Sequence, residues 1–200
     1  MADVLSPNEV SPLVIRWTRD DCAKLEQAGF LNGQYELVEG SINRMGQNMP
    51  HANVVRLCWR TLFGIFGDEF VVSQTSIDVR PEDNPTNEPM PDVIVLSRPA
   101  DKFDRYPKPD EIRLLVEVSD TTQRYDLTTK AGLYARAGIT DYWVVSVRDR
   151  NVIVHRGSDQ GMYRDVILFE EHEQVTPLGA SESPVKVADL FPAQELEAYP

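Results

Sequence analysis

Hydrophobic residues gather in short runs along the chain, and the most apolar run is Leu114 to Val118. A run of this kind is typical of a central strand that is covered on both faces. It contains one charge, Glu117, and an ionised carboxylate there is costly unless a metal, a cation or several donors meet it. A second apolar run, 93–96, follows directly on Asp92. We therefore expect a polar site where these two strands lie.

The same kind of pattern predicts the other elements. A capping box at Thr18 and Asp21 starts a short helix that ends near residue 28. Further helices are expected from about 51 to 67 and from about 123 to 137. Strands are expected over 35–39, 42–45, 70–79, 93–96, 112–118, 142–145, 152–154 and 163–169, with a short closing segment at 185–191.

This order of elements predicts an α/β or α+β fold, in which helices pack on a mixed central β-sheet. The chain has 200 residues, a length that suits one domain. We expect residues 1–16 to form an N-terminal arm and residues 17–200 to form the domain.

A third unusual charge is Lys130, on the helix expected after the central strand. Leu127, Lys130, Ala131 and Tyr134 share one helix face by their spacing, and only that face is apolar enough to meet the sheet. Lys130 could bend its amine out to water. Alternatively, because a short connection joins the strand to this helix, the amine could meet Glu117, and each buried charge would then stabilise the other.

Composition limits the classes of partner. The formal net charge of −12 argues against sequence-independent binding of nucleic acid over a broad surface, although it does not exclude a nuclease. A local basic patch remains possible beside a solvated surface; the candidates are Arg136, Arg148, Arg150, Arg156 and Arg164. No run approaches a membrane span, and no signal peptide is visible.

The few metal-binding and redox residue types are scattered. Cys22 and Cys58 share no motif, so we expect reduced thiols in a cytoplasmic protein. The three histidines are far apart in the sequence and do not support a zinc site.

Asp92 and Glu117 together suggest a chemistry. Taken alone, Asp92 after Pro91 could be ordinary turn chemistry. On neighbouring strands, however, the two carboxylates would offer paired hard oxygen ligands, which suit Mg²⁺ or Mn²⁺. A cation-activated water, oriented by Lys130, would then fit the hydrolysis of a phosphodiester bond.

Several of these segments resemble the bacterial Uma-type restriction endonuclease family, which belongs to the PD-(D/E)XK nuclease superfamily. The similarity covers roughly residues 17–191. The segments that carry it are Tyr35 to Gly40, His51, Pro91-Asp92, Glu117 to Ser119, Lys130 with Tyr134, and Gly138 to Val145.

The resemblance implies a restriction-endonuclease-like fold and a DNA endonuclease that needs Mg²⁺. Asp92, Glu117 and the backbone carbonyl of Val118 would bind the metal, and Glu36 would be an additional acidic catalytic residue. The superfamily usually has lysine two residues after this glutamate, where the chain has Ser119, so Lys130 would supply the amine from the helix.

Other roles stay open. Glu36 could equally be an exposed hairpin carboxylate, and His51 could be a plain helix-start residue. A homodimer is expected, because two-fold symmetry suits a cut through both DNA strands. The alternatives to an active nuclease are a binding or regulatory module that keeps the nuclease fold, and a structural ion network around Lys130.

Overall fold

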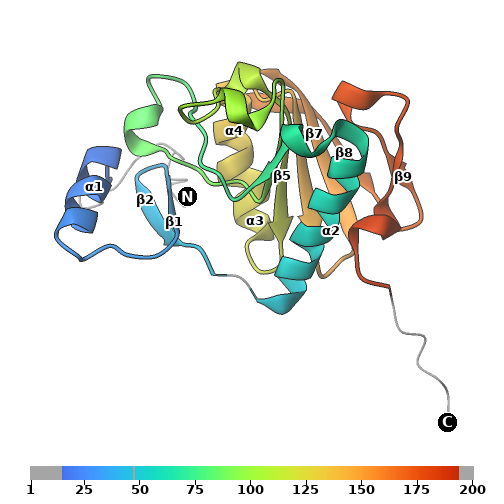
Figure 1. Ribbon diagram of the computed structural model, residues 1–200, viewed down its shortest axis with the longest axis horizontal. Helices are drawn as coiled ribbons and strands as arrows, with labels where there is room; N and C mark the ends of the chain where they lie inside the picture. Colours follow the sequence, from blue (N-terminus) through green and yellow to red (C-terminus); the bar gives the residue numbers. More distant parts are fainter. Residues whose placement is uncertain (1–14, 47, 194–200) are drawn as a thin grey trace, which may run out of the picture.

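A six-stranded mixed sheet forms the centre of the molecule, which we describe from a computed structural model covering residues 15–46 and 48–193 (Figure 1). Residues 1–14 of the expected N-terminal arm lie outside the described residues. The strand order is β3-β4-β5-β6-β7-β8, and only β5 and β6 pair in parallel. The strands are β3 (Val71–Ser73), β4 (Val93–Leu96), β5 (Ile112–Ser119), β6 (Asp141–Ser146), β7 (Asn151–Asp159) and β8 (Met162–Phe169). The expected single domain with a mixed sheet is thereby confirmed.

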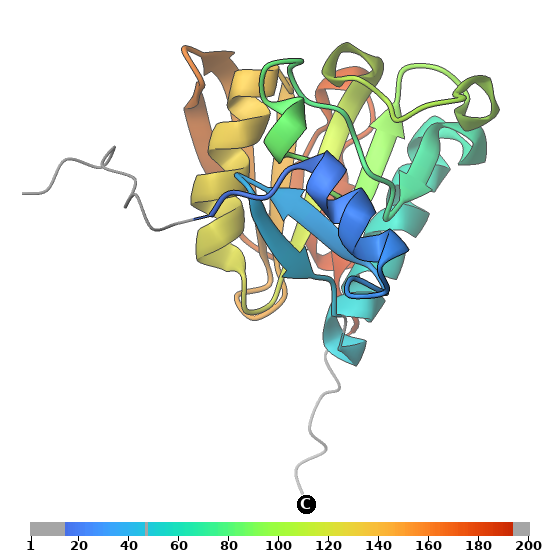
Figure 2. The same cartoon turned by 90° about the vertical axis from the view of Figure 1, so that its left-hand side faces the viewer.

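Helices cover both faces of this sheet, which explains why its central strands are apolar throughout. The long helix α2 (Met49–Phe66) and the C-terminal segment pack on one face, around Trp143 and Val116. The other face is covered by α3 (Gln123–Tyr125), the turn that follows it and α4 (Ala131–Ala137), around Tyr134 and Tyr142. Figure 2 shows these two layers on opposite sides of the sheet. In the part of the chain that the structure describes, no helix has the length and apolarity to cross a membrane.

The N-terminal elements form a separate layer beside the sheet. Helix α1 (Arg19–Gln27) begins with the predicted capping box at Thr18, and the hairpin of β1 (Tyr35–Val38) and β2 (Ser41–Arg44) follows it. The two residues of the hairpin turn, Glu39 and Gly40, both have positive φ, which is the geometry of a type I′ turn. A Cβ at Gly40 would lie 2.6 Å from the Cβ of Arg16, so glycine is required there.

The expected strand over 70–79 is wrong beyond Ser73. Gln74 adopts a positive φ and the chain leaves the sheet, after which Ile77 and Asp78 donate their backbone N–H groups to the loop carbonyls of Pro89 and Pro107. Ile77 and Val79 are nevertheless buried. The alternation of apolar residues therefore predicted burial correctly, although the backbone N–H groups of this segment bond to loops and not to a strand.

The closing segment expected at 185–191 is present and consists of two short elements. Residues 185–191 divide into a two-residue strand, β10 (Val185–Lys186), and the 3₁₀ turn Val187–Leu190. β10 pairs with β9 (Gln174–Val175), which the sequence pattern did not predict, because two residues carry too little periodicity.

The predicted helix 123–137 contains an irregular turn. Residues Asp126–Lys130 form a π-helical turn between α3 and α4, and Gly138 ends the helix in the left-handed conformation, as predicted. The Tyr142 hydroxyl donates to the backbone carbonyl of Asp126 at 3.0 Å. Single π turns are frequent at functional sites, and this one carries two of the charged residues discussed below.

An aromatic stack beneath this helix contains a buried histidine. The ring of His155 lies 5.1 Å from that of Tyr142 and 5.5 Å from that of Tyr163, centroid to centroid. Burial lowers the pKa of His155 below its ordinary value, so the native state holds the ring neutral.

This burial predicts a loss of stability in mild acid. Below about pH 6.5 the unfolded chain binds a proton at His155 that the native state resists, so the free energy of unfolding falls by up to about 1.4 kcal/mol per pH unit. His155→Phe should remove this contribution. Urea unfolding of both chains at pH 7.5 and 5.5 measures it, and an equal pH dependence in the two chains would contradict the prediction.

Candidate active site

Asp92 and Glu117 lie next to each other on two inner strands of the central sheet, Asp92 just before β4 and Glu117 near the end of β5. β4 and β5 are antiparallel, and Val93 pairs with Val116, so the register places Asp92 opposite Glu117. Both side chains are buried, with exposed fractions of 3% and 2%. The Asp92 carboxylate is anchored, because the backbone N–H of Val118 donates to its Oδ2 at 2.8 Å. The predicted pair of carboxylates on adjacent strands is therefore present.

Lys130 points into this site and not to water. Its amine nitrogen lies 3.0 Å from Glu117 Oε1 and 2.8 Å from Glu36 Oε2, and the residue is 4% exposed. A third carboxylate, that of Asp126, lies 3.9 Å away. Burial lowers the pKa of Lys130, but the three carboxylates outweigh burial and leave the pKa above its ordinary value. Lys130 is thus a buried ammonium ion at neutral pH.

Glu117 is held by two donors on the following helix. The Tyr134 hydroxyl donates to Glu117 Oε1 at 2.7 Å, and Lys130 Nζ reaches the same oxygen. Burial raises the pKa of Glu117 well above its ordinary value, and Lys130 opposes that rise. Both donors meet Oε1, and no other residue of the described chain bonds Oε2, so this oxygen is available to another partner.

Glu36 reaches the site from the hairpin. It lies on β1, is 4% exposed, and accepts the backbone N–H of Met90 at 3.4 Å. The alternative of an exposed hairpin carboxylate is therefore wrong. Glu39, on the same hairpin, instead pairs outside the site with Arg136.

Two further side chains join the site: His51, whose role the sequence patterns left open, and Asp126, on the π-helical turn. His51, near the start of α2, places its Nε2 3.3 Å from Asp92 Oδ2. Burial lowers the pKa of His51, but Asp92 outweighs burial and leaves it above its ordinary value. Asp126 accepts hydrogen bonds from Ser119 Oγ at 2.5 Å and from Thr122 Oγ1 at 2.7 Å, and burial raises its pKa. Ser119, two residues after Glu117 in the sequence, thus holds Asp126.

These groups line a cavity of about 500 Å³ beneath the hairpin. Its charged lining is mostly acidic, with five carboxylates against two cationic side chains, and Val118 also lines it. The acidic residues are Glu36, Asp92, Glu117, Asp120 and Asp126, and the cationic ones are Arg44 and Lys130. A polyanion would be repelled from such a cavity unless a cation entered with it.

The lining fits a divalent cation. Asp92 Oδ1 is buried and has no hydrogen-bond partner within the described residues, which is unusual for a carboxylate oxygen. Among residues 15–46 and 48–193, no three His, Cys, Asp or Glu side chains are already arranged as a metal centre. The donor set of two carboxylates and a carbonyl suits Mg²⁺, which keeps several waters.

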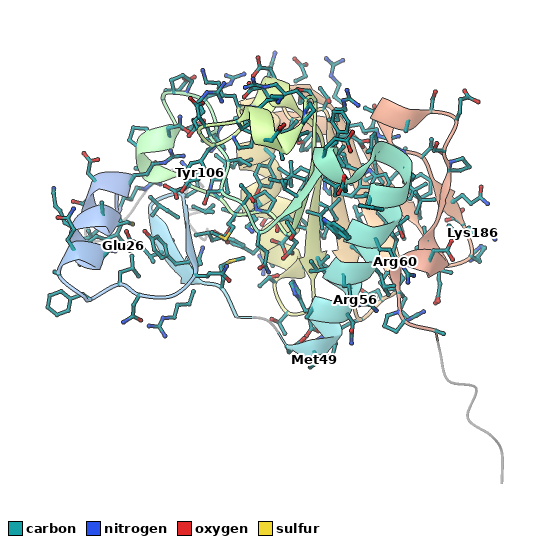
Figure 3. The ribbon with its side chains drawn as sticks, viewed as in Figure 1. Glu26, Met49, Arg56, Arg60, Tyr106 and Lys186 are labelled. Carbon is teal, nitrogen blue, oxygen red and sulfur yellow. The ribbon has the colours of Figure 1, made fainter. Side chains whose placement is uncertain are left out.

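The arginines considered for a basic patch do not provide one. Each of the five lies within ion-pair distance of a carboxylate; the partners are Glu39, Asp120, Glu171, Asp141 and Asp159. Two arginines without an ion pair in the described chain, Arg56 and Arg60, point outward from α2 and are labelled in Figure 3.

Comparison with known proteins adds a family and a fold. Residues 24–184 match the model of the Uma2 family, described as "Putative restriction endonuclease". A crystal structure of a "putative nuclease belonging to DUF820" from Anabaena variabilis superposes with a TM-score of 0.61 at 17% sequence identity. The superposition covers 84% of this chain and 96% of the other, and at this identity it shows the shared fold alone. No curated protein matches the chain.

Proposed function

The chain belongs to the Uma2 family of restriction-endonuclease-like proteins, and on that premise we propose that it is a Mg²⁺-dependent DNA endonuclease. The observation that carries the proposal is the buried pair Asp92 and Glu117, with one oxygen of each outside the hydrogen bonds of the site. Two buried carboxylates held side by side repel each other. A positively charged ligand between them would best explain why both are buried there.

Asp92, Glu117 and the carbonyl of Val118 would hold the cation. A divalent ion supplies two effects when bound: it lowers the pKa of a coordinated water, and it neutralises charge on a phosphate. Mn²⁺ should replace Mg²⁺, because both accept the same oxygen ligands.

The chain's own residues would orient the reacting groups. Lys130 is positively charged and is fixed by Glu117 and Glu36, so its remaining N–H can donate to a phosphate oxygen or to a water. Tyr134 holds Glu117 in place through its hydroxyl. His51 on α2 contacts the Asp92 carboxylate and would limit its movement.

A non-catalytic module with the same fold is the second candidate. It is favoured by one observation: Lys130 already pairs with Glu36 and Glu117 and lies 3.9 Å from Asp126, as in a structural ion network. In that case the site would bind no divalent ion, and DNA would not be cut.

A titration with Mn²⁺ tests the proposal. Calorimetry should detect binding to the wild-type chain and at least a tenfold weaker affinity in Asp92→Asn, because a neutral amide replaces one of the two carboxylates. Asp110→Asn, on an exposed loop, serves as the control and should bind as the wild type does. Equal affinity in wild type and Asp92→Asn would reject the metal site. Plasmid cleavage with Mg²⁺ or EDTA then separates a nuclease from a module that merely binds metal.

A further inference from the structure

The outermost strand of the sheet, β8, is unusually apolar for an exposed edge. Ten large hydrophobic side chains are exposed in the described residues, and four of them belong to this eight-residue strand. They are Met162 (69% exposed), Val166 (55%), Ile167 (47%) and Leu168 (48%). In Figure 2 the orange β7–β8 hairpin stands at the margin of the fold, away from α2. A patch of this kind marks an interaction site.

The edge also lacks several of the features that normally prevent strands from pairing, and its charged residues are limited to Arg164 and Asp165. β8 contains no proline and no lysine, and its register with β7 runs without a bulge from Met162 to Phe169. Within residues 15–46 and 48–193, β7 is the only strand that pairs with it. Its outer backbone groups therefore form a regular template for another strand.

We propose that the partner is a second copy of this chain, whose β8 pairs antiparallel with the first across a two-fold axis at Ile167. This symmetry places Ile167 opposite itself and Val166 opposite Leu168 of the partner subunit. It also places Arg164 opposite Glu170 of the partner subunit, twice over because of the symmetry. In this register the apolar residues at the centre of the edge face one another, and the arginine of one subunit faces the glutamate of the other.

Shifting the two-fold axis to a neighbouring residue of β8 would bring less favourable side chains opposite each other. An axis at Asp165 would set two carboxylates directly against each other, and like charges in opposed positions destabilise a sheet. An axis at Val166 would place Arg164 opposite an apolar leucine. Arg164 is 70% exposed at its side chain and pairs with Asp159, but an exposed pair of this kind contributes little and can be exchanged.

An apolar groove continues the interface. It lies between the helix and the β7–β8 hairpin, has a volume of about 340 Å³, and is lined by Leu127, Ala131, Ile153 and Val166, among others. The partner's Leu168, opposite Val166, would extend this apolar surface across the axis. The pairing would thereby join two six-stranded sheets into one of twelve strands. It does not depend on metal binding or on DNA cleavage.

Oligomeric state measured by light scattering tests the inference. The wild-type chain should be a dimer at micromolar concentration, and Ile167→Lys should raise the dimer dissociation constant roughly tenfold or more, since lysine on an edge strand opposes pairing. Phe30→Lys, an exposed apolar site far from β8 in the sequence, is the matched control and should remain dimeric. A monomeric wild type, or a dimer that Ile167→Lys leaves intact, would overturn the proposal.

Charge exchange tests the register. Arg164→Glu should weaken the dimer, because it faces Glu170 of the partner subunit, and the double variant with Glu170→Arg should restore it. Both residues are exposed, so the fold should not change. If the double variant is as weak as the single one, this register is wrong.

Cysteine cross-linking gives a second measure of the register. Cys22 and Cys58 are buried and are the chain's only cysteines, so an introduced thiol would be the accessible one. Ile167→Cys should form a disulfide dimer on mild oxidation, because opposed Cβ atoms lie about 5 Å apart. Asp165→Cys should not, because its copies would lie ~13 Å apart along the strands. Equal cross-linking at both positions contradicts an axis at Ile167.

Discussion

Glu117→Gln should lower Mg²⁺-dependent cleavage of DNA about a thousandfold, because a cation at a phosphoryl centre contributes several kcal/mol to transition-state stabilisation. Glutamine keeps the shape of Glu117 and can still accept the hydrogen bond from Tyr134, but it removes the charge that would hold the metal. Lys130 keeps Glu36 and Asp126 as partners in this variant, so the chain should remain folded.

The measurement is the rate of plasmid nicking with Mg²⁺, with circular dichroism as a check of the fold. Glu39→Gln is the control, because Glu39 lies on the same hairpin as Glu36 but pairs with Arg136 outside the cavity. The control should cut DNA at the wild-type rate. If Glu117→Gln also cuts at that rate, then Glu117 does not act in catalysis, whatever the family implies.

Much of the candidate site could be predicted because buried charges are conspicuous in an apolar sequence. Glu117 interrupts the most apolar run of the chain, and Lys130 interrupts the apolar face of a helix. The short connection between β5 and the helix limits how far these two residues can separate. The adjacency of Asp92 to Glu117, by contrast, depends on the order of strands in the sheet, which the sequence patterns alone did not determine.

The parts that could not be predicted depend on contacts between distant segments. β3 ends at Ser73 because loop carbonyls receive the following N–H groups, and no local pattern announces those partners. The π turn adds a residue to one helical turn, and periodicity of 3.6 cannot reveal it in advance. His51 approaches Asp92 from α2, which packs on the opposite face of the sheet from the helix that carries Lys130, and no local pattern pairs these two residues.

Lys130→Met should destabilise the protein by about 3–5 kcal/mol, because removing one partner of a buried ion pair leaves the other charges uncompensated. Lys130 is the only cation within 4 Å of Glu36, Glu117 and Asp126 among the described residues. Without it, all three carboxylates must either remain charged in a buried site or take up protons. Arg136→Met, on the same helix, breaks a half-exposed pair with Glu39 and should cost less than about 1 kcal/mol.

The loss of stability in Lys130→Met should depend on pH and on metal ions, and the metal dependence distinguishes a cation site from a plain ion network. Burial already raises the pKa of Glu117 and of Asp126, and removing Lys130 raises both further. The native state of the variant then binds more protons than the unfolded chain, so the deficit in the free energy of unfolding should be larger at pH 8 than at pH 5. A cation site should in addition let Mn²⁺ replace the missing ammonium, and urea unfolding should show that Mn²⁺ stabilises Lys130→Met more than the wild type. If Mn²⁺ stabilises neither chain while the pH dependence appears, the carboxylates serve only to balance Lys130, and the proposed chemistry fails even though the fold is that of a nuclease.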